Sequence, residues 1–105
     1  MTIQLNTDNN LSVHEAFGDK LHDLLSGKLN RFSEYITRLE VHLSDENGNK
    51  EGLNDKRCML EARLKGRQPI AVTEVANNYE QAVNGAIDKL KTTLDTIIGR
   101  SGNHH

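Results

Sequence analysis

The sequence has few of the residues that mark specialised chemistry. Among its 105 residues there is one cysteine, Cys58, one proline and no tryptophan. A single cysteine excludes a disulfide framework and a CxxC metal site, and it fits a reducing compartment. The sequence has no apolar run of membrane-spanning length and no basic segment leading into an apolar run at its start. We therefore expect a cytoplasmic protein with no membrane partner.

An excess of positive charge is also missing. Lysine and arginine number 13 against 15 aspartates and glutamates, a net charge of -2. A nucleic-acid-binding domain usually carries the opposite imbalance, so any RNA contact must depend on a local basic cluster. The apolar fraction of 35% is low and suits a thin fold with one solvated sheet face. The length suits one domain, which we place at residues 1–100, followed by a disordered tail over 101–105.

Four segments alternate between apolar and polar residues and are predicted to be strands. They cover residues 2–6, 36–44, 57–65 and 70–75. A stretch rich in glycine and asparagine separates the second from the third, and it is predicted to be a loop over 45–55. Cys58 falls in the inward phase of its strand, which indicates a small buried core residue rather than a nucleophile.

Two segments carry apolar residues at helical spacing. Ser12 followed by Glu15 is a capping box and predicts a first helix that ends near Asn30. Asn77 or Asn78 is expected to cap a second helix, which Gly99 is expected to stop. The predicted buried stripes are Val13, Ala16, Phe17, Leu21, Leu24, Leu25 and Phe32 in the first helix, and Tyr79, Val83, Ala86, Ile87, Leu90, Leu94 and Ile97 in the second.

This order of elements, strand, helix, three strands and helix, predicts an α+β fold written β-α-β-β-β-α. Each helix has one apolar stripe and the strands share one apolar face. A four-stranded sheet with both helices packed on one face buries all of these surfaces. We expect an antiparallel sheet in which the first strand lies beside the second and the others form a meander.

Residues that could support catalysis or bind a metal are isolated in the sequence. His14 and His22 could share a helix face, but no third ligand stands at a metal-binding spacing. The terminal pair His104-His105 is expected to belong to an unstructured end. The carboxylates are scattered among lysines and arginines, and there is no phosphate-binding loop or dinucleotide motif. We expect neither an enzyme nor a site for a metal, a cofactor or a small-molecule substrate.

The basic residues of the two helices could converge on RNA. If the helices lie side by side, Lys28, Arg31 and Lys89 could meet along the groove between them, where phosphate contacts need no base-reading code. The alternative is a solvated charged face, because acidic residues of the same helices balance these cations. The outward sheet face, with Met59 among arginines and glutamates, could instead serve self-association or another protein partner.

Several short stretches, taken in order, match one known family. These are Ile3-Gln4-Leu5-Asn6, Glu15-Ala16, Lys28-Leu29, the run from Arg38 to Asp45, Asn47-Gly48, the run from Asp55 to Cys58, Tyr79 with Ala82, and Ala86-Ile87-Asp88-Lys89-Leu90. In this order, from Thr2 to about Arg100, the chain resembles short members of the family of hibernation-promoting factors and ribosome-associated inhibitor A, the sigma-54 modulation protein family.

The resemblance implies a fold similar to a double-stranded-RNA-binding domain and a partner, the small ribosomal subunit. The family binds 16S rRNA in the channel used by mRNA and tRNA, and it blocks translation under stress or in stationary phase without a cofactor. Lys28 and Lys89 match the family's RNA-binding positions best. The further residues expected at the RNA-binding site are Lys91, Arg31, Arg63, Lys65 and Arg67, with Lys20 as a possible substitute for a missing lysine.

The chain departs from the family pattern in both helices. Leu24-Leu25 stands where the first helix usually carries another lysine, and the stretch from Thr92 to Thr96 stands where short members are often rich in lysine. Fewer phosphate contacts imply weaker and more salt-sensitive binding. The departures also leave open a second role, a protein-interaction module of the same fold that forms a homodimer or binds a regulatory partner instead of ribosomes.

Overall fold

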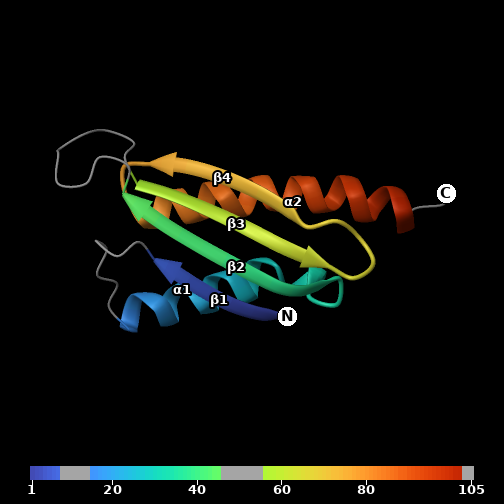
Figure 1. The fold of residues 1–105 in the computed structure, drawn as a ribbon, viewed down its shortest axis with the longest axis horizontal. Helices are drawn as coiled ribbons and strands as arrows, with labels where there is room; N and C mark the ends of the chain where they lie inside the picture. The colour runs from blue at the N-terminus through green and yellow to red at the C-terminus, as the bar shows by residue number, and fades with distance from the viewer. Residues whose placement is uncertain (8–14, 46–55, 103–105) are drawn as a thin grey trace.

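The structure, a computed structural model, describes residues 1–7, 15–45 and 56–102 (Figure 1). Its elements follow one another in the order predicted from the sequence. They are β1 (Thr2–Thr7), α1 (Glu15–Lys28), a short 3-10 helix η1 (Asn30–Phe32), β2 (Ile36–Asp45), β3 (Lys56–Leu64), β4 (Ile70–Ala76) and α2 (Tyr79–Gly102). The predicted α+β class and the β-α-β-β-β-α order are confirmed.

The strands form one sheet in the order β1-β2-β3-β4, which confirms the predicted neighbours. The prediction of an antiparallel sheet is wrong at one edge, because β1 runs parallel to β2 with Ile3 opposite Leu39. Between these strands α1 carries the chain back along the sheet, so both strands start from the same end. The other two pairs, β2–β3 and β3–β4, are antiparallel. The sheet is therefore mixed.

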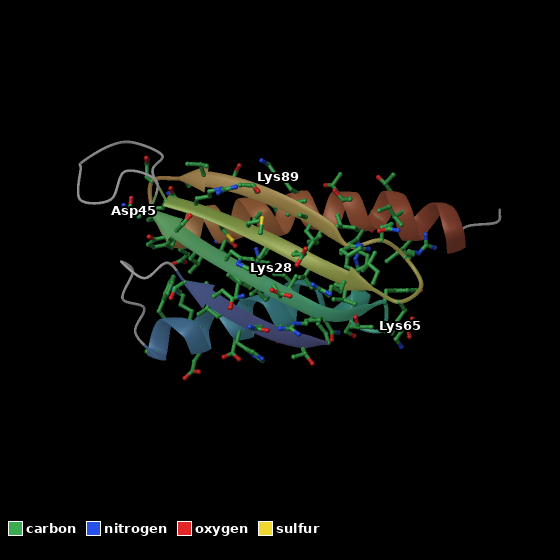
Figure 2. All side chains as sticks on the ribbon, viewed as in Figure 1. Lys28, Asp45, Lys65 and Lys89 are labelled. Carbon is green, nitrogen blue, oxygen red and sulfur yellow. The ribbon has the colours of Figure 1, made fainter. Side chains whose placement is uncertain are left out.

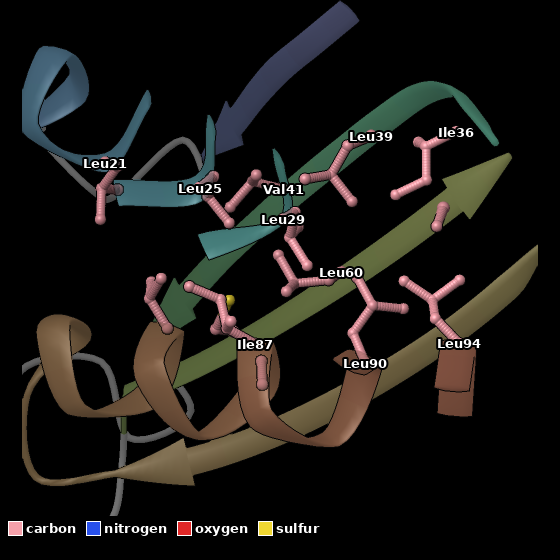
Figure 3. Close-up of a cluster of buried hydrophobic side chains, with 14 of the residues drawn as sticks. Leu21, Leu25, Leu29, Ile36, Leu39, Val41, Leu60, Ile87, Leu90 and Leu94 are labelled. Carbon is pink, nitrogen blue, oxygen red and sulfur yellow. The ribbon is translucent and has the colours of Figure 1, made fainter. Parts of the chain in front are cut away.

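Both helices cover the same face of the sheet, as predicted (Figure 1). The α2 helix packs over β3 and β4, and α1 lies along β1 and β2. Figure 3 shows how the apolar side chains of the two helical segments meet over the sheet, with Leu25 and Leu29 on one side and Leu90 on the other. This shared core brings the two helices side by side.

The buried stripes differ from the prediction at several described positions, among them Ala82 of α2, which is fully buried but was absent from the predicted stripe. Leu29 is fully buried although it was absent from the predicted stripe, because the chain stays over the core after α1 ends. Ala16 is exposed, since its offset of five residues from Leu21 turns it away from the core face. At the end of α2, Ile98 rather than Ile97 packs against the core, because Ile98 continues the four-residue spacing of the buried leucines.

The ends of α2 follow the prediction at one terminus only. The Oδ1 of Asn78 accepts a hydrogen bond of 2.8 Å from the backbone N–H of Gln81, which makes Asn78 the helix cap. The predicted stop at Gly99 is wrong, because α2 continues to Gly102. Among the described glycines only Gly66 has a positive φ, so Gly99 is not a left-handed helix terminator. A glycine inside a helix costs about 1 kcal/mol, too little to end it.

Some predictions concern residues that the structure does not describe. The cap at Ser12, residues 46–55 of the predicted loop and residues 103–105 of the predicted tail all fall there. The predicted loop over 45–55 is wrong at Asp45, because this residue pairs with Lys56 as the last residue of β2. The predicted tail is wrong for residues 101 and 102, which belong to α2. Within the described residues no helix combines the length and the apolar character that crossing a membrane requires.

Candidate nucleic-acid interface

Polar side chains bridge the two helices across their line of contact. Three bonds form this ladder: the Nζ of Lys20 donates to Glu80 at 2.9 Å, the Nζ of Lys28 donates to Oδ1 of Asn84 at 3.2 Å, and Nη2 of Arg31 donates to Asp95 at 2.5 Å. The cations come from α1 and η1, and their acceptors all come from α2. We call these six residues, together with Lys91, the helix seam.

Lys91 belongs to the seam through the geometry of α2. It stands seven residues after Asn84 and four before Asp95, so all three lie on one face of the helix. No described carboxylate pairs with Lys91. The seam thus has four cations and two carboxylates, an excess of two positive charges on a chain whose net charge is -2.

Arg31 is also positioned by an aromatic ring. Its guanidinium carbon lies 4.5 Å from the centroid of the Phe32 ring, and Phe32 is itself buried in the core. Such a cation–π contact holds a guanidinium in place without neutralising its charge. The side chain of Arg31 remains 61% exposed, so it can still reach a ligand.

An open hollow lies at one end of the seam. Phe17 of α1 and the first turns of α2 surround a volume of about 550 Å³. Its polar lining comes from Asn78, Glu80, Gln81 and Asn84. The seam is therefore open to solvent at this end rather than closed by side chains.

The structure contradicts the predicted meeting of Lys28, Arg31 and Lys89. The Nζ of Lys89 donates to the backbone oxygen of Thr73 at 2.7 Å and pairs with Glu74 at 2.9 Å, and both partners belong to β4. Five residues separate Lys89 from Asn84, which corresponds to about 140° around the helix. Lys89 thus lies on the flank of α2 that faces away from α1, as the labels for Lys28 and Lys89 in Figure 2 show.

The remaining predicted residues belong to β3 and the connection after it. Arg63 lies on the open face of the sheet, where its Nε is 3.6 Å from Glu40. Lys65 and Arg67 are exposed in the turn around Gly66 that leads to β4. Of the eight residues predicted to bind RNA, the structure gathers Lys20, Lys28, Arg31 and Lys91 along the seam. Arg63, Lys65, Arg67 and Lys89 lie elsewhere.

The open face of the sheet brings together one group with metal-ligand chemistry that the sequence analysis missed. Donor atoms of Glu40, His42 and Glu61 lie within 4.8 Å of one another. Arg38 and Arg63 already pair with Glu40, at 3.4 and 3.6 Å. Because these arginines supply the positive charge that a cation would bring, we interpret the group as an ion-pair network.

Cys58 has the environment predicted from its strand phase. Its side chain is fully buried in the core between β2 and β4. Burial raises the pKa of this thiol from 9.0 to about 12. At neutral pH it is a protonated thiol, which is a poor nucleophile, so the prediction of a core residue is confirmed.

The comparisons with known proteins agree with this architecture. Residues 6–100 match the family model described as Sigma 54 modulation protein / S30EA ribosomal protein. The chain belongs to this family. The family resemblance inferred from the sequence motifs is thereby confirmed. No curated protein sequence matches the chain.

Two solved structures illustrate the family fold. The N-terminal domain of Protein Y from Thermus thermophilus superposes with a TM-score of 0.72 at 25% identity, over 92% of this chain and 99% of that one. A ribosomal subunit interface protein from Coxiella burnetii superposes with a TM-score of 0.71 at 19% identity, over 94% of this chain and 99% of that one. The family fold therefore extends over nearly the whole chain.

Proposed function

We propose that this protein is a hibernation factor that binds the small ribosomal subunit and blocks translation under stress or in stationary phase. Its site would be 16S rRNA in the channel used by mRNA and tRNA. Membership of the family supports this proposal, as does the likeness to Protein Y of Thermus thermophilus. A ribosomal partner implies a cytoplasmic protein.

The observation that carries the proposal is the helix seam. It concentrates four cations on one surface of an otherwise acidic chain. Attraction to RNA depends on such local charge, and contacts to phosphate need no base-reading code. The side chains of Lys20 and Arg31 are 59% and 61% exposed, which leaves them able to reach phosphate oxygens.

The proposed mechanism is occupancy rather than reaction. The sheet and helices share one continuous core, so the domain can act as a rigid body that fills space. A rigid domain held by phosphates in the mRNA–tRNA channel would exclude both ligands of that channel. The buried, protonated thiol of Cys58 has no part in this mechanism.

Co-sedimentation with purified small subunits across a salt series tests the proposal, with large subunits as the control. We expect saturable binding to small subunits that weakens steeply as salt rises, and competition from mRNA with tRNA. Absence of binding at low salt would refute the proposal. Light scattering would then show whether the protein is instead a self-associating interaction module.

A further inference from the structure

Two of the four seam cations are already occupied by carboxylates of the same chain. Lys20 pairs with Glu80 at 2.9 Å and Arg31 pairs with Asp95 at 2.5 Å. Lys28 instead meets the neutral amide of Asn84. The seam therefore holds two kinds of cation, those with an internal counterion and those without.

The paired carboxylates stand where a ligand of the seam would lie. The cations come from α1 and η1 and the carboxylates from α2, so each pair spans the surface between the helices. Both members of each pair are about half exposed, at 59% and 52% for Lys20 and Glu80 and at 61% and 53% for Arg31 and Asp95. Exposed pairs of this kind are weak, so another anion can displace the carboxylate.

We infer that Glu80 and Asp95 set the affinity of the seam for RNA by competing with phosphates for Lys20 and Arg31. This inference rests on the proposed function. A phosphate offers the same charge as a carboxylate and can accept two hydrogen bonds from a guanidinium. Binding at these two positions is thus an exchange of one anion for another, whereas binding at Lys28 and Lys91 displaces no carboxylate.

The exchange has a signature in the salt dependence of binding. Each phosphate that a protein cation neutralises releases counterions from the RNA and contributes about -0.7 to -0.9 to the slope of log K against log salt. A displaced carboxylate takes up cations from solution and offsets part of that release. Removing both carboxylates should therefore make the slope steeper by up to about 1.5.

The test compares the double variant Glu80→Gln/Asp95→Asn with the wild type in small-subunit binding. The free energy needed to break one exposed ion pair corresponds to roughly a two- to fivefold change in the affinity for the small subunit. We expect the double variant to bind roughly five- to twentyfold more tightly at low salt, with the steeper slope. The matched control, Asp19→Asn/Glu34→Gln, removes the same charges from exposed residues that have no described ion pair with the seam.

The outcomes separate this inference from the proposed function. If the double variant binds no more tightly than the control, or its slope is unchanged, the competition does not exist. If only the double variant binds, the competition is real and the proposed function of the wild type is wrong. If neither binds, both ideas fail. The substituted side chains are exposed, and circular dichroism on the double and both single variants verifies folding before binding is compared.

Discussion

Charge reversal at the two seam lysines without a carboxylate partner should abolish most binding to the small subunit. At 4 Å in water a pair of unit charges contributes about 1 kcal/mol. Reversal replaces an attraction by a repulsion, about 2 kcal/mol for each site and about 4 kcal/mol for Lys28→Glu/Lys91→Glu. This corresponds to roughly a thousandfold loss of affinity at low salt, which screening reduces at higher salt. Among the described contacts, the free protein loses the Lys28–Asn84 hydrogen bond.

The assay is co-sedimentation of each variant with small subunits, and the control is Lys89→Glu. This substitution makes the same charge change on the other flank of α2, beside β4. We expect it to weaken binding less than either Lys28→Glu or Lys91→Glu alone. Equal losses from all three single variants, or full binding by the double variant, would refute the assignment of the site to the seam.

Three further predictions concern the stability of the fold. Leu90 is completely buried, so Leu90→Ala should lower the free energy of unfolding in urea by about 2–5 kcal/mol, and a loss below 1 kcal/mol would contradict its place in the core. Asn78→Ala should remove the cap of α2 and lower the same quantity by about 1 kcal/mol, whereas Asn78→Asp should preserve it. The raised pKa of Cys58 means that the folded state keeps a proton that the unfolded state loses. The contribution of the Cys58 thiol to the free energy of unfolding should therefore be full below pH 9 and decline between pH 9 and about 12. Urea unfolding of the Cys58→Ala variant over the same pH range should lack this decline.

Local patterns were sufficient to predict most of the fold. Alternation located all four strands, and the inward phase of Cys58 placed it correctly in the core. The parallel pairing of β1 with β2 was missed because alternation reports which face a residue occupies and says nothing about strand direction. The direction of β2 is instead set by α1, which carries the chain back along the sheet before β2 begins. Gly99 was misread as a stop because composition alone does not show whether a glycine adopts a positive φ.

The candidate site was harder to predict because its contacts join distant parts of the chain. The three bonds of the seam connect residues 60, 56 and 64 positions apart. Lys89 could have been separated from the seam by its angle around α2, but only once Asn84 was known to face α1. In the same way, the group around Glu40 required the register that places Glu61 directly opposite on β3.

We propose that the helix seam faces 16S rRNA inside the mRNA–tRNA channel. Cryo-electron microscopy of small subunits saturated with the protein tests it most directly. We predict density for this domain in the channel, with Lys28 and Lys91 within reach of rRNA phosphates and the open face of the sheet turned away. Density outside the channel, or a domain that meets the rRNA through its sheet face, would contradict the account.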